Sequence, residues 1–378
     1  MAIHKTAAWP LAQAYAALIL YASLYPFTGW RDQGTAPWEF LSSPWPRYWT
    51  GFDIAANVAG YAPLGFLLAL AFLRRGIALR GPAGRGGAIG IATLSAALLS
   101  LCTEGLQTYL PYRVPSNVDF GLNVAGAALG AVTAGALEIA GAIDRWSRFR
   151  KRWFVEESRY ALVLVALWPL ALLFPPSVPL GLGQVFERLE VALADWLLDT
   201  PFLEWLPVRD VELQPLVPGV ELICVALGAL TPCLLGYSVM RSVGRRAAFA
   251  ATLVTTGVLA TALSAALSWG PVHAWAWLSL PVRLGLVVGL AMALLLLRAG
   301  RRGCGALLLL TLVVHLALLN QAPASAYFAD TLQAWERGRF IHFNGLAQWL
   351  GWVWPYATLV YVLVSLSRPD PSLESPHE

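Results

Sequence analysis

The chain has few charged side chains for its length. Of its 378 residues, only 13% are Asp, Glu, Lys or Arg, whereas 58% are hydrophobic. Soluble globular proteins carry about a quarter charged residues, so this scarcity excludes an ordinary soluble fold. The hydrophobic residues also lie in blocks close to the ~20 residues that a helix needs to cross the hydrocarbon core of a bilayer. The sequence therefore predicts an all-α, polytopic transmembrane helical bundle.

Cysteine is scarce as well, and its spacing is not that of a metal or redox motif. None of the four cysteines forms a CxxC pair or has a histidine at metal-ligand spacing: Cys102, Cys224, Cys233 and Cys304. We interpret them as small buried hydrophobic residues. The sequence also lacks HExxH, GxSxG, a phosphate-binding loop and a dinucleotide fingerprint. We expect no metal, no cofactor and no nucleic-acid partner.

About ten apolar segments are long enough, or nearly so, to cross a membrane. They cover residues 8–28, 52–73, 88–110, 119–143, 160–178, 219–240, 247–269, 281–297, 306–320 and 346–366. The first segment follows His4 and Lys5, and no small-x-small cleavage site comes after it. We therefore expect a retained helix rather than a cleaved signal peptide.

The basic residues gather in alternate connectors between these segments. The connectors 74–87 and 144–159 hold four and six of them, and three arginines follow each of the sixth and eighth segments. Together with Lys5 and Arg368 they account for 18 of the 26 Lys and Arg residues. The positive-inside rule assigns this side to the cytoplasm. The pattern predicts a multi-pass protein of the bacterial cytoplasmic (inner) membrane with both termini cytoplasmic.

The longest basic connector divides the chain into predicted domains. We expect a four-helix membrane domain at 1–143, a basic cytoplasmic linker at 144–159, a six-helix membrane domain at 160–366 and a cytoplasmic tail at 367–378. An external segment near 184–212 places acidic residues between aromatic and aliphatic ones at nearly helical spacing. This spacing predicts a short amphipathic helix at the outer membrane interface.

An internal repeat opens two spans of the N-terminal domain. Residues 53–60 read Asp-Ile-Ala-Ala-Asn-Val-Ala-Gly, and residues 119–126 read Asp-Phe-Gly-Leu-Asn-Val-Ala-Gly, with five of eight positions identical. The Asp, Asn and Gly of each copy are spaced to share one helical face. Each Asp stands at the external end of its helix, where a carboxylate also serves as a cap and interacts favourably with the helix dipole.

A further carboxylate comes from the span between the two copies. Glu104 lies inside an apolar segment, about 10 Å along the helix from Pro111, and its position gives it no capping role. A charge at this depth costs a few kcal/mol unless it is paired or hydrated. We expect seven polar side chains to meet in the outer part of the bilayer: Asp53, Asn57, Glu104, Gln107, Arg113, Asp119 and Asn123.

Structural and functional interpretations of these side chains stand side by side. The aspartates serve equally well as helix caps, the asparagines as interhelical hydrogen-bonding groups, and Arg113 as a loop cation paired with Asp119. For Glu104 with Arg113 we favour a ligand-facing site and treat both as candidate catalytic residues. The candidate substrate-binding residues are Asp53, Asn57, Gln107, Asp119 and Asn123.

Other polar or small residues fit structural roles. The Gly126-x-x-x-Gly130 spacing favours close packing against another helix. Glu138 lies about 28 Å along its helix from Asp119, so we expect it to pair with arginines at the cytoplasmic end. His315 is interpreted as a core residue.

The site residues also carry a resemblance to a known family. Asp53…Asn57…Pro63-Leu-Gly-Phe66, Glu104…Gln107…Arg113 and Asp119…Asn123…Gly126…Gly130 are similar to the pattern of the VanZ-like family, over residues near 15–143. This family has a core of about four membrane helices and is named for a protein associated with resistance to the glycopeptide teicoplanin. The resemblance implies a cell-envelope membrane protein. It supplies no reaction, and the minimal family member has no counterpart of the six C-terminal helices.

Three functions fit this sequence. The first is an outer-face site (Glu104, Arg113 and Asp119) that binds or modifies a lipid-linked or cell-wall-related substrate, linked to glycopeptide resistance or surface polysaccharide. The second is a non-enzymatic membrane scaffold or binding protein, and the third is a transporter. Transport ranks last because transporter sites usually lie near the bilayer midplane. The expected partners are membrane lipids and a lipid-linked envelope precursor; catalysis and oligomeric state stay open.

Overall fold

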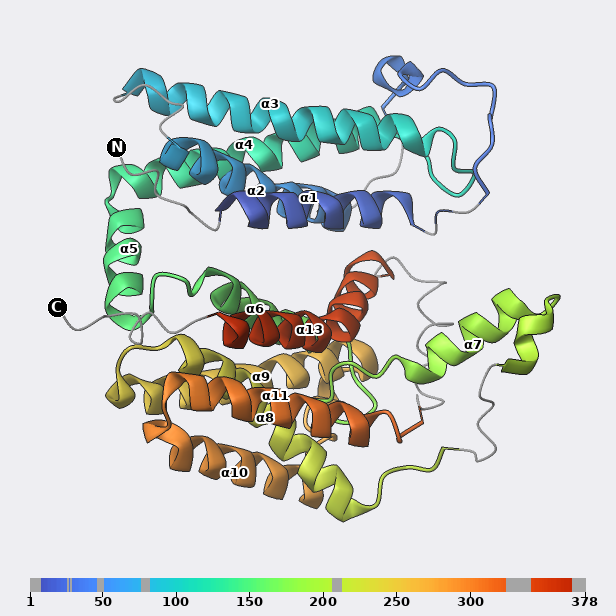
Figure 1. Cartoon of the computed structure of the whole chain (residues 1–378). Helices are drawn as coiled ribbons and strands as arrows, with labels where there is room; N and C mark the ends of the chain where they lie inside the picture. Colours follow the sequence, from blue (N-terminus) through green and yellow to red (C-terminus); the bar gives the residue numbers. More distant parts are fainter. Residues whose placement is uncertain are drawn as a thin grey trace. The chain divides into compact units, whose positions relative to one another are not determined.

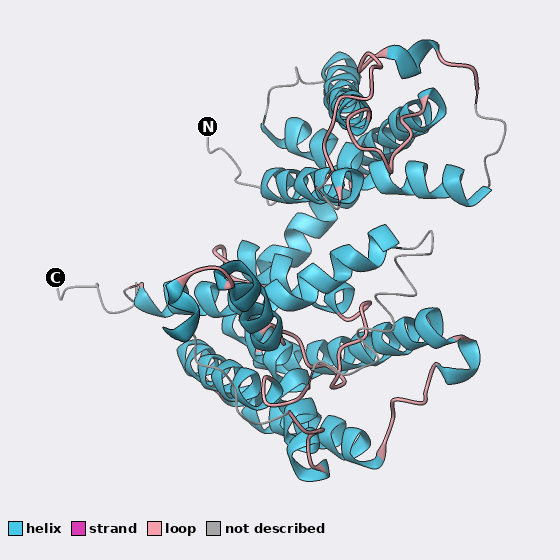
Figure 2. Cartoon of the chain, turned by 90° about the vertical axis from the view of Figure 1, so that its right-hand side faces the viewer, coloured by secondary structure: helices cyan, strands magenta, loops and turns pink. Residues whose placement is uncertain are grey.

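The computed structural model describes residues 8–45 except 26 and 28, and residues 51–75, 82–205, 213–323 and 341–368. Within these ranges the regular structure is helical (Figures 1 and 2), apart from one isolated β-bridge between Phe154 and Met240. The predicted all-α fold class is confirmed. The chain separates into two compact units, Met1–Arg150 and Lys151–Glu378.

The described residues of the first unit form four apolar helices and a polar one. They are α1 (Ala8–Leu24), α2 (Gly51–Arg75), α3 (Pro82–Gln107), α4 (Asn117–Ile139) and α5 (Ala142–Trp153), with a short 3-10 helix η1 (Glu39–Ser42) before α2. The basic, amphipathic α5 runs three residues into the second unit. The predicted third span ends early, because α3 stops at Gln107 and a turn follows.

The other helices of the described residues lie in the second unit. They are α6 (Arg159–Ala171), α7 (Phe186–Leu197), η2 (Pro201–Trp205), α8 (Pro218–Val239), α9 (Val243–Trp269), η3 (Pro271–His273), α10 (Leu280–Leu295), η4 (Leu296–Arg298), α11 (Arg301–Leu319) and α13 (Ile341–Ser367). The predicted fifth span also ends early: α6 stops at Ala171, shortly before Pro175 and Pro176, which cannot donate backbone hydrogen bonds.

Each of the ten predicted spans overlaps an apolar helix of the structure. Among the described residues, eight helices are long and apolar enough to cross a membrane, and α1 and α6 are shorter apolar helices. The chain is therefore a multi-pass membrane protein, whereas its orientation stays a prediction. The predicted external segment contains α7 and η2, and its residues 206–212 lie outside the described part. The predicted C-terminal tail also lies outside it after Arg368.

Small residues bring α2 and α4 into close contact. A Cβ atom added at Gly126 would lie 2.4 Å from the carbonyl oxygen of Val58, and one added at Gly130 would lie 1.8 Å from that of Ala62. The predicted packing role of this glycine pair is confirmed. The contacts advance by four residues on both helices, so α2 and α4 run parallel and the two copies of the repeat lie at the same level.

At the opposite end of the first unit, two ion pairs link neighbouring helices. Arg74 pairs with Asp144 of α5 at 2.8 Å, and Arg85 pairs with Glu138 of α4 at 3.4 Å. The pairing predicted for Glu138 is therefore confirmed. The polar residues of the repeat and these ion pairs occupy opposite ends of the helices.

In the second unit α8 lies at the centre. It is the most buried of the candidate spans, and glycines of α10 pack on it: Cβ atoms at Gly285 and Gly289 would each come within 2.7 Å of an α8 carbonyl oxygen. His315 and the second-unit cysteines are buried, as predicted. The expectation was wrong for Cys102, which is exposed on α3, because that position lies on the outer apolar face of its helix.

One predicted cytoplasmic arginine lies inside this core. Arg246 of α9 is only 3% exposed. Its guanidinium donates to the carbonyl oxygens of Leu297, Ala299 and Tyr237 over 2.8, 2.7 and 2.9 Å. It thereby satisfies the last carbonyls of α8 and of η4, which have no partner within their own helices.

Candidate functional site

The seven predicted site residues lie at one end of the first unit, where α2 and α4 begin and α3 ends (Figure 1). We call them the polar cluster: Asp53 and Asn57 from α2, Glu104 and Gln107 from α3, Arg113 from the connector, and Asp119 and Asn123 from α4. The parallel packing of α2 and α4 places the two copies of the repeat beside one another, with the end of α3 against them.

The two copies of the repeat are joined by a side-chain hydrogen bond. Asn57 Nδ2 donates to Asp119 Oδ1 over 2.8 Å. Asp119 is also close enough to Asp53 for the two carboxylates to repel each other. All three side chains are only partly buried. They form the accessible side of the polar cluster.

The cap of α4 differs from the expectation. Ser116 is the N-cap, because its Oγ accepts from the backbone N–H groups of Val118 and Asp119. Asp119 therefore sits in the first turn, where the helix dipole favours a negative charge, but it is not the capping residue. The spacing of Ser116 and Asp119 is close to that of a capping box and was the signal that could have identified Ser116 from the sequence.

Glu104 forms the buried floor of the cluster. It is 5% exposed, and its Oε2 accepts from the backbone N–H of Ser116 over 3.0 Å. It interacts electrostatically with Asp119 and with Arg113. Its carboxylate thus holds the start of α4 in place while it contributes to the charge of the site.

Asn123 is the second buried polar residue of the floor. It is 4% exposed, and its Nδ2 donates to Ser100 Oγ over 3.0 Å. Its Oδ1 finds no hydrogen-bond partner in the described part of the chain. A buried amide oxygen without a partner costs about 1–3 kcal/mol. It is one of the few buried polar atoms without a hydrogen-bond partner among the described residues of the first unit.

Arg113 and Gln107 hold the end of α1. Arg113 donates to the carbonyl oxygens of Ala22 and Tyr25 over 3.1 and 3.2 Å, and Gln107 Nε2 donates to that of Ser23 over 3.0 Å. These carbonyls belong to the last turn of α1 and the residue after it, where partners are otherwise missing. Burial lowers the pKa of the Arg113 guanidinium, and the nearby Glu104 acts in the opposite direction.

The carboxylates of the cluster are not arranged as a metal centre. Across the described ranges, no three His, Cys, Asp or Glu side chains are placed to hold a metal ion. The cluster combines the partly exposed carboxylates of Asp53 and Asp119, which accept hydrogen bonds, with the buried polar side chains of Glu104 and Asn123. Such a cluster is suited to binding polar groups that donate hydrogen bonds.

Comparison with known families agrees with this geometry. Residues 5–138 match the VanZ/LLP1 family model. The resemblance predicted for this region is therefore confirmed, and we call residues 5–138 the VanZ/LLP1 domain. The match contains the whole polar cluster and ends before α5, so the helices of the second unit lie outside it. No curated protein and no solved structure is significantly similar to the chain.

Proposed function

We propose that the VanZ/LLP1 domain binds the polar group of a lipid-linked or cell-wall-related molecule at the polar cluster, in a bacterial cytoplasmic membrane. The observation that carries this proposal is the meeting of three carboxylates, Asp53, Glu104 and Asp119, at one end of an apolar bundle. Ionisable residues in membrane segments are costly and usually mark functional sites. The proposal fits a role in glycopeptide resistance or in surface polysaccharide.

The chemistry of the cluster indicates the class of group that it would bind. Ionised carboxylates accept hydrogen bonds and cannot donate them, and Asp53 and Asp119 line the accessible side. Arg113 donates hydrogen bonds to carbonyl oxygens at the end of α1. The ligand therefore has to supply donors, such as the hydroxyl groups of a sugar or an ammonium group. Lipid-linked saccharides and aminated lipid headgroups both carry such donors.

Binding is tested with the full chain purified in detergent from bacterial membranes. Native mass spectrometry is expected to detect a co-purified polar lipid on the wild type. Asp119→Asn should lower its occupancy about tenfold, because a charge-assisted hydrogen bond contributes about 1.5–3 kcal/mol. Asp144→Asn, which removes a carboxylate at the opposite end of the unit, is the matched control. Equal occupancy in the two variants would contradict the proposal.

Modification of the substrate, with Glu104 as general acid or base, is the alternative. Glu104→Gln keeps an oxygen that accepts from Ser116 but removes the transferable proton, so binding and teicoplanin susceptibility are expected to stay within about twofold of wild type. Glu104→Leu leaves the Ser116 N–H without its acceptor, which costs about 1–3 kcal/mol, and should lose both. A folded, ligand-binding Glu104→Gln variant without the cellular phenotype would instead favour acid–base chemistry.

A further inference from the structure

The second unit contains an irregular segment packed inside its helical bundle. Between α6 and α7, the side chains of Val178, Leu180 and Leu182 are all buried. Leu180 has a φ of +62° and Gly183 a φ of +97°. A non-glycine residue in this left-handed region costs about 1–3 kcal/mol and persists where the surroundings hold it. Irregular backbone at membrane depth is tolerated only when it is enclosed by protein or lines a cavity.

Side chains from two helices fix this segment. Asn320, which follows α11, accepts with its Oδ1 from the N–H groups of Val185 and Phe186, each over 3.1 Å. The carbonyl oxygen of Gly183 accepts from Asn320 Nδ2 over 3.3 Å and from the Tyr356 hydroxyl over 3.0 Å. A Cβ atom at Gly183 would lie 2.5 Å from a side-chain carbon of Leu316. The start of α7 is therefore rigidly placed against α11 and α13.

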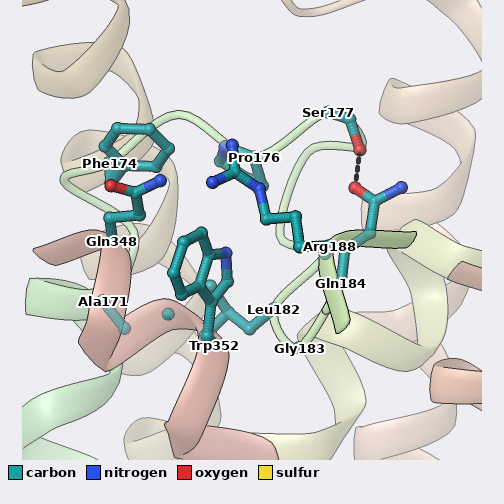
Figure 3. A pocket seen from close by; sticks show the side chains of 12 residues that line it. Ala171, Phe174, Pro176, Ser177, Leu182, Gly183, Gln184, Arg188, Gln348 and Trp352 are labelled. Atoms are coloured by element: carbon teal, nitrogen blue, oxygen red, sulfur yellow. Dashed lines mark hydrogen bonds between the residues drawn. The ribbon is translucent and has the colours of Figure 1, made fainter. Parts of the chain in front are cut away.

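A small, partly open pocket lies where this segment meets α7 and α13. Figure 3 shows Arg188 of α7 and Gln348 and Trp352 of α13 around the same space. The Arg188 guanidinium carbon lies 4.7 Å from the centre of the Trp352 ring. Ser177 donates a short hydrogen bond to Gln184 on the other side of the pocket.

Two side chains that line this pocket, Arg188 and Gln348, carry N–H donors. Gln348 is 6% exposed, and its Nε2 has no hydrogen-bond partner among the residues that the structure describes. In Figure 3 this amide nitrogen points toward the side of the pocket occupied by the Arg188 guanidinium. The Arg188 guanidinium carries five N–H donors; it contacts the Trp352 ring and is attracted to Glu187.

The pocket also lies at the end of the apolar helices. Gln348 is the second residue of the candidate span Ala347–Ser367, and Ala171 is the last residue of α6. This is the level at which the headgroups of a bilayer lie. Burial lowers the pKa of the Arg188 guanidinium, and Glu187 acts in the opposite direction; an anion in the pocket would offset the cost of that burial.

We propose that the pocket formed by Arg188, Gln348 and Trp352 binds a phosphate group, carried by a lipid headgroup or by a soluble phosphate compound. Arg188 provides a pair of donors suited to phosphate oxygens, and Gln348 Nε2 provides one more. Trp352 and Phe174 form an apolar wall for the carbon atoms next to the phosphate. This site is independent of the one proposed in the VanZ/LLP1 domain.

The test uses the full chain in detergent and three probes: dioctanoyl phosphatidate, dioctanoylglycerol and inorganic phosphate. Phosphatidate is expected to raise the midpoint of thermal unfolding, because a ligand that binds the folded state stabilises it; dioctanoylglycerol should not. Arg188→Gln should raise the half-saturating concentration about tenfold. Arg283→Gln, which removes an exposed arginine of the same unit, is the matched control and should leave it unchanged.

Gln348→Leu separates a ligand-binding role from a structural one. Replacing a buried, unpartnered amide by an apolar side chain of similar size should leave the ligand-free midpoint equal or higher, while the response to phosphatidate falls. A response to inorganic phosphate as well assigns the site to soluble phosphates, and a response to phosphatidate alone assigns it to lipid headgroups. Equal responses to phosphatidate and dioctanoylglycerol, or unchanged affinity in Arg188→Gln, would overturn the proposal.

Discussion

Gly130→Ala is expected to destabilise the VanZ/LLP1 domain by about 2–3 kcal/mol or more. The new methyl group would lie 1.8 Å from the carbonyl oxygen of Ala62 and 2.7 Å from its carbonyl carbon. Both atoms belong to the backbone of α2, so no side chain can rotate away and the two helices have to separate. Overpacking of this kind costs about 1–3 kcal/mol even where side chains adapt. Thermal unfolding of the full chain in detergent, followed by circular dichroism, measures the loss.

The control for this variant lies on the same helix. Gly121→Ala also adds one methyl group to α4, but no atom lies within 4 Å of it. Because alanine favours helix over glycine by about 1 kcal/mol, this variant should be neutral or slightly more stable. Gly130→Ala should also weaken ligand binding, since the separation of α2 from α4 breaks the hydrogen bond between Asn57 and Asp119. Equal stability of the two variants would refute close packing of α2 on α4.

Arg246→Leu is expected to cost the second unit about 3 kcal/mol or more. The substitution keeps a bulky side chain but leaves the carbonyl oxygens of Tyr237, Leu297 and Ala299 without this donor. Each buried acceptor that loses its partner costs about 1–3 kcal/mol. The loss is measured as the decrease in the thermal unfolding midpoint of the full chain.

Two neighbouring substitutions make this result specific. Arg245→Leu removes the same charge one residue earlier, but Arg245 is only half-buried and donates to the carbonyl oxygen of Arg152 at the surface. Its effect should stay within about 1 kcal/mol. Arg246→Lys keeps the charge but not the fork of donors, so it should fall between wild type and Arg246→Leu. If Arg245→Leu and Arg246→Leu cost the same, the capping role of Arg246 is wrong.

The helices could be predicted because the bilayer restricts what a chain crossing it can form. Lipid offers no hydrogen bonds to the backbone, so an apolar segment of sufficient length has to be helical. The residues at which the helices end were harder to predict from the sequence. Gln107 ends α3 before the predicted boundary because the connector that follows folds back to hold α1, which is a tertiary contact. The early end of α6 at Ala171 could have been read from Pro175 and Pro176.

The sequence predicted which residues form the candidate site, but not which hydrogen bonds they make. The doubled Asp-x-x-x-Asn pattern identified Asp53, Asn57, Asp119 and Asn123. Residues four apart share one face of a helix, so each copy of the pattern presents its Asp and Asn on the same side. The sequence could not show that Arg113 holds α1, since Ala22 lies 91 residues away. Nor could it separate Arg246 from the surface arginines beside it, because its carbonyl partners on η4 and after it are 51 and 53 residues distant.

The contact between α2 and α4 also limits how the VanZ/LLP1 domain can move. The carbonyl oxygens of Val58 and Ala62 on α2 pack directly against Gly126 and Gly130 on α4. Sliding one helix past the other would drive a carbonyl into a neighbouring side chain, so the two helices move as one body. Asn57 and Asp119 thus keep their spacing whether or not a ligand is present. We therefore expect a conformational response to binding in α1, α3 or the connectors rather than between α2 and α4.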